Sequence, residues 1–338
     1  MTQFPQHDDD WYRARLALPH QAMPGLASSR PRVVIDTDAA NEIDDQFALA
    51  WALLSPAQLD VLAVYAAPFS FAHRRAALPH ASASDPQFNP PATGMLRSYD
   101  EINKVYSLLG LQADGKVFRG SEGYLPSLSQ PCRSEAVDHL IATARAGNGS
   151  QPLYVLALGC VTNIASALLL APDIVSRIVV VWTSGYPSHA PHINHSFNLE
   201  QDLLASQLLL DSGVPHVYLP GYHVGAQLRL SLPEMERHVQ GCGAIGNYLH
   251  ELFTHNPLWP LLGMDGKQPA CSWVIWDVIN VAWMLVPEWV PSELVRTPQL
   301  GDDKRWYSNG ARHLMREAHE VNRDAMFSDF FNKLKTAP

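Results

Sequence analysis

The fold of this chain is decided by residues 33–50, which read VVIDTDAANEIDDQFALA. The segment from Arg32 to Ile35 is typical of a short buried strand, and the apolar residues from Phe47 to Leu54 recur at helical spacing. Between them, residues 36–45 hold five acidic side chains in ten positions. The acidic loop therefore lies where a strand ends and a helix begins, which is where open α/β sheets place their sites.

This crowding of acidic residues indicates a bound cation. Neighbouring carboxylates raise one another's pKa and resist ionising together, so a cluster of them needs positive charge. A hard divalent cation is the natural partner for several carboxylate oxygens. Asp44 and Asp45 are adjacent near the start of the expected helix, where consecutive side chains diverge by about 100°. One of the two can therefore bind metal while the other acts as a base.

The rest of the chain alternates apolar strands with amphipathic helices. This alternation predicts an α/β fold with an open, mostly parallel sheet and helices on both faces. Beyond Ser231 we expect a mainly helical part, and before residue 31 an irregular lead-in with one short helix around residues 11–18. Residues 31–338 are predicted to form a single domain. Strands are expected at 60–66, 117–120, 153–158, 178–182 and 217–219, and helices at 99–109, 134–145, 162–170 and 203–211.

Residues 67–93 interrupt the alternation. They are rich in Pro, His, Ser and Ala and show no periodicity. A loop of this length inside a compact domain is usually functional, so we interpret it as a flap over an active site. A disordered surface insertion is the alternative interpretation.

Composition narrows the classes of function. The 338 residues are 47% hydrophobic and 17% charged, with no apolar run long enough to span a bilayer. A net charge of -9 argues against a nucleic-acid partner. No secretory signal is visible in residues 1–10, so a cytoplasmic location is expected, and a homo-oligomer is left open. The four cysteines are too sparse for a disulfide scaffold or zinc ribbon and are interpreted as reduced thiols.

Three further segments carry polar residues at or just past strand ends. Residues 157–165 read ALGCVTNIA, and residues 196–202 read SFNLEQD. The third segment places Asp277 inside a strongly apolar stretch, directly after Trp276. A buried carboxylate is expensive unless it is protonated, ion-paired or bound to a metal. Asp277 is therefore protonated, part of a structural ion pair or a metal ligand.

Taken in this order, the four segments resemble the inosine/uridine-preferring nucleoside hydrolase family. That family opens with Asp-x-Asp-Pro-Gly-x-Asp-Asp and continues with Leu-Gly-Pro-Leu-Thr-Asn. It then has Glu-Phe-Asn, with an Asp four residues after the Asn, and finally a late Asp. The spacing from Asn198 to Asp202 keeps this pattern. The resemblance covers about residues 32–290.

The resemblance implies a fold, a reaction and a set of residue roles. The fold would be nucleoside hydrolase-like, and the substrate a small molecule, a nucleoside or a related ribosyl compound. Asp44 would take a proton from a metal-bound water that attacks the anomeric carbon, and Asn198 would contact the sugar hydroxyls, which complete the metal shell. Asp36 would organise the loop. The implied ligands of a Ca²⁺ ion are Asp38, Asp45, the backbone carbonyl of Thr162 and Asp277.

The chain departs from the family pattern in the contacts to sugar and base. The first motif has two extra residues, because residues 39–43 stand where the family has Pro-Gly-x. Glu42 in this longer loop is either an additional ligand or, as we favour, a solvated acid near a helix N-terminus. Ser196 stands where the family has a Glu that binds the sugar near its 5′ end, and Glu200 is the nearest carboxylate that would replace it.

The group that protonates the leaving base is also undetermined. Some members of the family carry a His before the late Asp, where this chain has Trp276. Trp276 either stacks on a nucleobase or fills the core. The candidate replacement acids are His80, His192, His195 and His223.

Two other functions fit parts of the sequence. Asp36 and Asp38 match the Asp-x-Asp of a haloacid-dehalogenase-like phosphatase, which uses Mg²⁺ and a nucleophilic Asp, but that interpretation leaves Asp44 and Asp45 unused. The missing Glu instead suggests a metal- and sugar-binding module that has lost catalysis.

Overall fold

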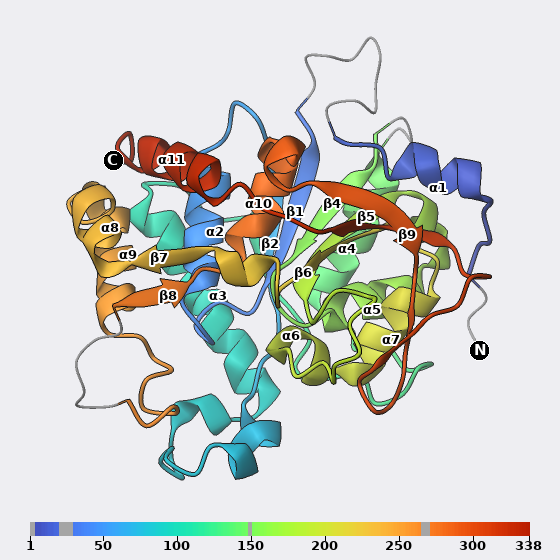
Figure 1. Cartoon of the computed structure of the whole chain (residues 1–338), viewed down its shortest axis with the longest axis horizontal. Coiled ribbons are helices and arrows are strands. Elements are labelled where there is room, and N and C mark those ends of the chain that lie inside the picture. Colours follow the sequence, from blue (N-terminus) through green and yellow to red (C-terminus); the bar gives the residue numbers. More distant parts are fainter. Residues whose placement is uncertain (1–3, 20–29, 148–150, 265–270) are drawn as a thin grey trace.

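A computed structural model describes residues 4–19, 30–147, 151–264 and 271–338 (Figure 1). These described residues form one eight-stranded sheet. All its strands run parallel except β9, which pairs antiparallel with β12 at one edge. In spatial order the strands are β3 (Val117–Arg119), β2 (Asp60–Ala66), β1 (Arg32–Thr37), β4 (Leu153–Ala157), β5 (Ile178–Ser184), β6 (His216–Pro220), β12 (Leu314–Ala318) and β9 (Ser292–Arg296).

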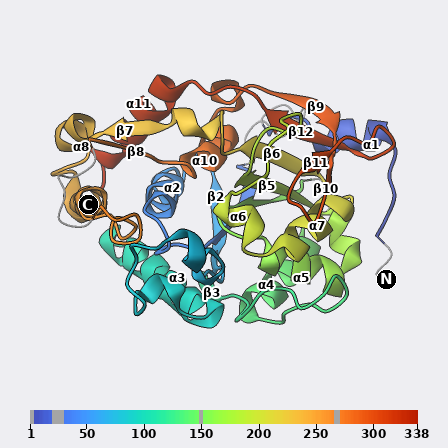
Figure 2. The ribbon, with the colours of Figure 1, turned by 60° about the horizontal axis from the view of Figure 1, so that its bottom comes forward.

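Helices cover both faces of the sheet, as the sequence predicts (Figure 2). Successive side chains of a strand point to opposite faces, so Val33 and Ile35 enter one core and Val34 enters the other. The first core includes residues of α2 (Asp44–Leu53), α3 (Pro91–Leu108), α9 (Gly243–Thr254), α10 (Val278–Leu285) and α11 (Arg323–Leu334). The second core includes residues of α4 (Glu135–Ala146), α5 (Thr162–Leu170) and α7 (Leu203–Asp211).

The strand order reverses beside β1. The chain moves outward from β1 through β2 to β3, and it then returns to place β4 on the other side of β1. A parallel sheet has a crevice at such a switch point, beyond the carboxyl ends of the strands. The acidic loop follows β1, and the segment that includes Gly159 and Thr162 follows β4, so both border this crevice.

The described residues after Ser231 include four α-helices, in line with the prediction of a mainly helical part, but they also include strands that the sequence did not predict. The strands β9 and β12 lie there and extend the sheet beyond β6. Arg316 and Glu317 interrupt the apolar pattern of β12, which hid this strand in the sequence. The remaining strands form two small sheets, β7 (Arg229–Ser231) with β8 (Ser272–Val274) and β10 (Gln299–Leu300) with β11 (Trp306–Tyr307). The remaining helix in this part is α8 (Leu232–His238).

The N-terminal lead-in packs on the core. Its helix α1 (Asp9–Arg15) begins two residues earlier than expected, because the Asp8 side chain accepts a hydrogen bond from the backbone N–H of Trp11 at 2.8 Å. Tyr12 is buried, and its hydroxyl donates to the carbonyl of Gly213 at 2.6 Å. In the part of the chain that the structure describes, no helix combines the length and apolar character needed to cross a membrane.

Residues 67–93 pack against the acidic loop and against α6 (Phe197–Glu200). They contain the short 3₁₀ helices η1 (Ala72–Ala77) and η2 (Pro86–Phe88), and α3 starts at Pro91, earlier than predicted. The Phe71 ring stacks on Phe197 at 4.2 Å between centroids. Gln87 donates a 2.9 Å hydrogen bond to the carbonyl of Asn41. The segment therefore forms part of the walls around the crevice and is not a separate surface insertion.

Candidate active site

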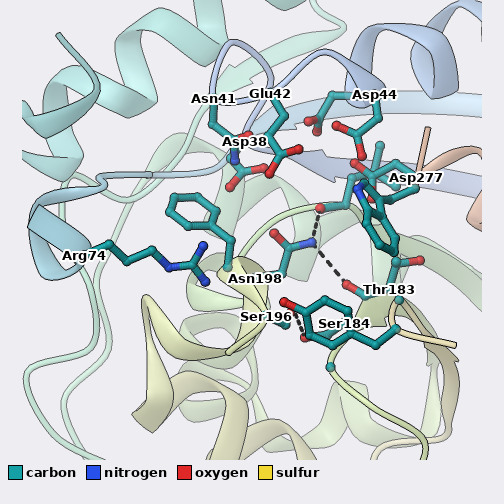
Figure 3. A pocket seen from close by; sticks show the side chains of 17 residues that line it. Asp38, Asn41, Glu42, Asp44, Arg74, Thr183, Ser184, Ser196, Asn198 and Asp277 are labelled. Carbon is teal, nitrogen blue, oxygen red and sulfur yellow. Dashed lines mark hydrogen bonds between the residues drawn. The ribbon is translucent and has the colours of Figure 1, made fainter. Parts of the chain in front are cut away.

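A pocket opens at the carboxyl ends of β1, β4 and β5 (Figure 3). Of the residues expected to bind the metal or the substrate or to act as the base, Thr162 does not line it, and Asp38, Asp44, Asp45, Ser196, Asn198, Trp276 and Asp277 do. The lining residues are Asp38, Asn41, Glu42, Asp44, Asp45, Arg74, Leu158, Thr183, Ser184, Gly185, Ser196, Phe197, Asn198, Gly221, Tyr222, Trp276 and Asp277.

Three buried carboxylates meet at the base of this pocket. One oxygen from each of Asp44, Asp45 and Asp277 lies within 4.8 Å of the others. The first two begin α2, and Asp277 directly precedes α10, so two helices that pack together present all three. Oδ1 of Asp277 is buried and has no hydrogen-bond partner among the described residues. This oxygen-rich, underpaired set fits a hard divalent cation.

The pKa values of these acids show that the protein alone does not compensate their charge. Burial raises the pKa of Asp38 to about 7, with a further contribution from the charge of Asp44. Burial also raises the pKa of Asp44 to about 6, although hydrogen bonds from nearby backbone groups lower it. The pKa values of Asp45 and Asp277 lie well above the usual range, through burial and then through repulsion by their acidic neighbours. A cation would favour the ionised forms of all four groups.

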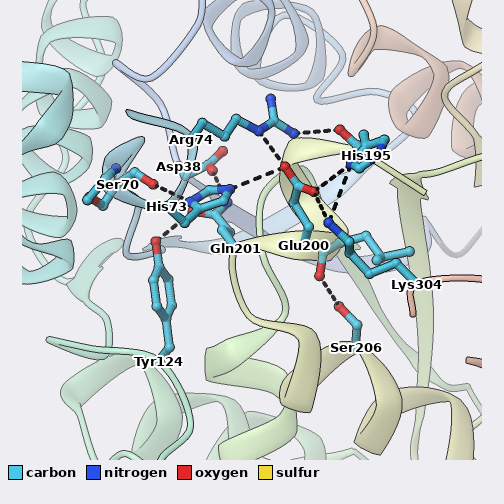
Figure 4. Close-up of polar contacts among 12 residues, drawn as sticks. Asp38, Ser70, His73, Arg74, Tyr124, His195, Glu200, Gln201, Ser206 and Lys304 are labelled. Carbon is cyan, nitrogen blue, oxygen red and sulfur yellow. Dashed lines mark hydrogen bonds and ion pairs between the residues drawn. The ribbon is translucent and has the colours of Figure 1, made fainter. Parts of the chain in front are cut away.

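Asp38 is held by groups behind it. Gln201 donates from Nε2 to Oδ2 of Asp38 at 3.0 Å, and the Tyr124 hydroxyl donates to Oε1 of Gln201 at 2.9 Å (Figure 4). A Cβ atom on Gly159 would lie 2.6 Å from Cγ of Asp38, so only glycine leaves room for this carboxylate. Oδ1 of Asp38 is buried and has no partner among the described side chains and backbone.

Asp36 lies outside the pocket. It is fully buried at the end of β1, and its Oδ1 accepts a 2.7 Å hydrogen bond from Asn163. Asn163 in turn accepts from Ser121, so Asp36 ties the loops after β3 and β4 together. The phosphatase interpretation is wrong, because its nucleophile would be this inaccessible carboxylate.

Thr162, expected to bind the metal through its backbone carbonyl, does not line the pocket. It is buried at the start of α5, and its hydroxyl donates to Oδ2 of Asp202 at 2.5 Å. Asp202 also caps α7 by accepting from the backbone N–H of Ala205 at 3.0 Å. Through this contact Thr162 joins the start of α5 to the start of α7.

Asn198 lies between the ends of β4 and β5. Its Nδ2 donates to the carbonyls of Leu158 at 2.6 Å and Thr183 at 3.1 Å. These bonds fix the amide and leave its Oδ1 without a hydrogen bond to the described residues. Ser196 lies beside it, with its Oγ 3.1 Å from Oγ of Ser184. This side of the pocket therefore presents an amide and two hydroxyls.

Aromatic side chains also line the pocket. Trp276 lines the pocket and meets Tyr222 edge to face, with 6.0 Å between ring centroids. Tyr222 packs on Tyr186, which also contacts His192 and His223. None of the four candidate histidines lines the pocket. His195 contacts Glu200, and His80 lies against Gly263.

Glu42 is not the solvated acid that we favoured. It lines the pocket, and burial, followed by the charge of Asp44, raises its pKa to about 8. The longer loop reaches this position through Ala40, whose φ of 76° is left-handed and costly for a residue with a Cβ. Arg97 stabilises this conformation by donating to the Ala40 carbonyl at 3.0 Å.

Arg74 is a charged pocket residue that the sequence did not predict. It lies in η1, and its Nε donates to Oε1 of Glu200 at 2.5 Å. Glu200 does not line the pocket, so the expectation that its carboxylate replaces the missing Glu is wrong. The run of His73, Arg74 and Arg75 was the available signal, because residues 67–93 carry no other Lys or Arg.

Comparisons with known proteins match this chain to one family over most of its length. The model of the inosine-uridine preferring nucleoside hydrolase family matches residues 33–328. The chain is 28% identical over 266 residues to the non-specific ribonucleoside hydrolase RihC of Salmonella typhi, which covers 76% of this chain and 79% of that protein.

Two solved structures share the fold. The plant nucleoside hydrolase PpNRh1 aligns over 91% of this chain and 100% of its own, with 16% identity and a TM-score of 0.67. The purine-preferring ribonucleoside hydrolase of Gardnerella vaginalis aligns over 90% and 98%, with 19% identity and a TM-score of 0.66.

Proposed function

Because the chain belongs to the inosine-uridine preferring nucleoside hydrolase family of glycosidic-bond hydrolases, we propose that it is a Ca²⁺-dependent hydrolase of the N-glycosidic bond of a nucleoside or related ribosyl compound. The observation that carries this proposal is the convergence of Asp44, Asp45 and Asp277 at the base of a pocket that also contains Asp38. Calcium prefers six to eight oxygen ligands in a flexible shell, and this site is built from oxygen donors.

We assign the cation to the carboxylates of Asp38, Asp45 and Asp277, with Asp44 beside them as the base. When bound, a divalent cation supplies charge that lowers the pKa of a water molecule in the site. Asp44 takes the proton from the attacking water. The charge of a bound cation would favour the ionised form of Asp44, which is the form that accepts a proton.

The remaining pocket residues bind and orient the substrate. Cleavage of the bond to C1′ passes through a state with oxocarbenium character, which the surrounding carboxylates stabilise electrostatically. Asn198 accepts a hydrogen bond from a sugar hydroxyl through its free Oδ1, because its Nδ2 is already fixed by two carbonyls. Trp276 and Tyr222 form the apolar surface on which the base stacks.

One assay separates this enzyme from a binding module that has lost catalysis. The protein is incubated with Ca²⁺ and a panel of purine and pyrimidine ribosyl compounds, and released reducing sugar is measured. We expect turnover by the wild type that is at least about 100-fold above the Asp44→Asn variant, the usual contribution of a positioned base. Equal sugar release by the two proteins on every compound would favour the binding module.

A further inference from the structure

Arg74 is the only basic side chain among the described residues that line the pocket. Arg74 lies across the pocket from Asp44 and Asp277, on the side where Ser196 and Ser184 lie (Figure 3). Metal binding and proton transfer do not use it, because its hydrogen bonds go to Glu200 and the carbonyl of His195 and not to Asp38, Asp44, Asp45 or Asp277. A cation at this place points to a negative charge on the substrate.

Arg74 is held in a defined position. The Phe71 ring stacks on Phe197, which fixes the start of η1 against α6. The guanidinium lies over the same Phe197 ring, 5.1 Å from its centroid. Its Nε donates to Glu200 and its Nη2 donates to the carbonyl of His195 at 2.5 Å, while Nη1 makes no hydrogen bond to the described residues. These contacts therefore orient the guanidinium group and leave its Nη1 available to a ligand.

Glu200 does not neutralise this side of the pocket. Its carboxylate, only 6% exposed, contacts Arg74 at 2.5 Å, Lys304 at 2.8 Å, and the rings of His73 and His195 (Figure 4). Arg74 and Lys304 thus bring two positive charges to the one negative charge of Glu200, and Glu42 is a further pocket acid whose charge interacts with Arg74. Burial alone would raise the pKa of Glu200, but its cationic partners outweigh burial and hold this pKa well below its usual range.

The charge expected near the 5′ end of the sugar is opposite to that in the family. The family places a Glu at the position of Ser196, which suits a neutral sugar hydroxyl. Here the carboxylate is absent, and Arg74 contacts the residues on both sides of Ser196. The Ser184 and Ser196 hydroxyls lie 3.1 Å apart on the same wall, as neutral hydrogen-bond donors. A phosphate brings nearly two negative charges and three acceptor oxygens, which match a guanidinium fork and two hydroxyls.

We propose that the substrate carries a phosphate at its 5′ end, as in a nucleoside 5′-monophosphate, with the phosphate bound by Arg74, Ser184 and Ser196. This rests on the proposed N-glycosidic hydrolysis. Water adds to C1′, the bond from C1′ to the base nitrogen breaks, and the base leaves with a proton. The phosphate ester stays intact, so the second product is ribose 5-phosphate.

The test compares inosine with inosine 5′-monophosphate, and uridine with uridine 5′-monophosphate, by base release in the presence of Ca²⁺. For the wild type we expect a kcat/KM at least about 10-fold higher on the monophosphates. In Arg74→Gln this preference should fall by about 10- to 100-fold, the range for a lost charge-assisted hydrogen bond. Glu200 keeps Lys304 and both histidines in this variant, so the fold should persist.

Arg75→Gln is the matched control. Arg75 lies in the same 3₁₀ helix but donates to the carbonyl of Ala83 and lies over Phe88, outside the pocket. It should leave the preference for monophosphates unchanged. Arg74→Lys keeps a charge but not the fork, so it should retain part of the preference. If Arg74→Gln has a much lower Tm than the wild type, Arg74→Lys replaces it in the comparison of monophosphates with nucleosides.

The outcomes separate the two proposals. The phosphate site would be overturned if the wild type had the same kcat/KM on nucleosides as on their monophosphates. It would also be overturned if Arg74→Gln lowered kcat/KM equally on both kinds of substrate. Neither result would overturn the hydrolase proposal. If no compound is hydrolysed, the hydrolase proposal fails, and calorimetry with ribose 5-phosphate and ribose then tests the phosphate site. Tighter binding of ribose 5-phosphate that is lost in Arg74→Gln would support it, and equal binding of the two sugars would overturn it.

Discussion

Gln201 donates a hydrogen bond from Nε2 to Oδ2 of Asp38 at 3.0 Å, which leaves Oδ1 of Asp38 as the oxygen without a partner among the described residues. The Tyr124 hydroxyl fixes the Gln201 amide from the other end. Asp38 therefore presents one defined oxygen, although it lies in a loop with two more residues than the family motif. The contact explains how a longer loop still presents this carboxylate.

Replacing Gln201 with Leu removes the hydrogen bond but keeps a side chain of similar size. We expect Ca²⁺ affinity to fall by about 10- to 100-fold, the usual cost of losing a group that orients a metal ligand. Isothermal titration calorimetry measures this change. Gln207→Leu is the control, because Gln207 lies on α7 and donates to Leu300 and Asp302 instead. If the two variants bind Ca²⁺ with equal affinity, Gln201 does not orient a metal ligand.

Asp45→Asn and Asp277→Asn each remove one negative charge from the cation site. Removing a metal ligand should lower Ca²⁺ affinity more than removing a group that only orients a ligand. We therefore expect a decrease of at least about 100-fold. Elemental analysis after gel filtration gives the bound metal per chain. Asp100→Asn, at an exposed position of α3, should bind calcium as the wild type does. Retention of calcium by both pocket variants would refute the assigned site.

Asp44→Asn tests the division of labour between the two adjacent acids. As the base, Asp44 contributes to turnover and not to the cation shell, so kcat should fall by about 10²- to 10⁴-fold while bound calcium stays near the wild-type level. Kinetics and elemental analysis on the same preparation give both values. Asp44 lies within 4.8 Å of Asp45 and Asp277. Loss of the metal from Asp44→Asn would therefore place it among the ligands.

The raised pKa values predict how calcium stabilises the protein at different pH. Burial raises the pKa of Asp38 from 3.8 to about 7, so between these values the folded state binds more protons than the unfolded state. Without metal, this group therefore contributes stability at low pH that is lost as the pH rises towards 7. Calcium takes the place of the protons, so the increase in Tm on adding Ca²⁺ should be larger at pH 8 than at pH 5.5. An equal or smaller increase at pH 8 would contradict this.

The sequence predicts the parallel sheet as far as β6 and brings most of the acidic residues to one place. Asp38 follows β1 and Asn198 lies in the segment after β5, and the carboxyl ends of these parallel strands lie at the same edge of the sheet, so their meeting follows from parallel topology. Asp277 follows β8 of a separate small sheet, and it joins them because α10 packs on α2. The strand β12 was not predicted, because its charged residues Arg316 and Glu317 hide the apolar pattern.

The positions of Arg74 and Glu42 could not be predicted. Residues 67–93 have no periodicity, and Arg74 reaches the pocket only because Phe71 stacks on Phe197, more than a hundred residues away in sequence. Glu42 faces the pocket because Ala40 adopts a left-handed conformation that a sequence pattern favours only for Gly, Asn or Asp. Both positions depend on tertiary contacts and not on local propensity.

The central claim, that a cation in the acidic pocket supports hydrolysis of ribosyl compounds, is tested most directly by a calcium titration. Chelated protein is titrated with Ca²⁺, and bound calcium and sugar release from the most active substrate of the panel are measured at each point. We expect turnover to rise in proportion to bound calcium and to reach its maximum at about one ion per chain, as for a single carboxylate site. Full turnover in the chelated protein, or no sugar release with calcium bound, would contradict the account.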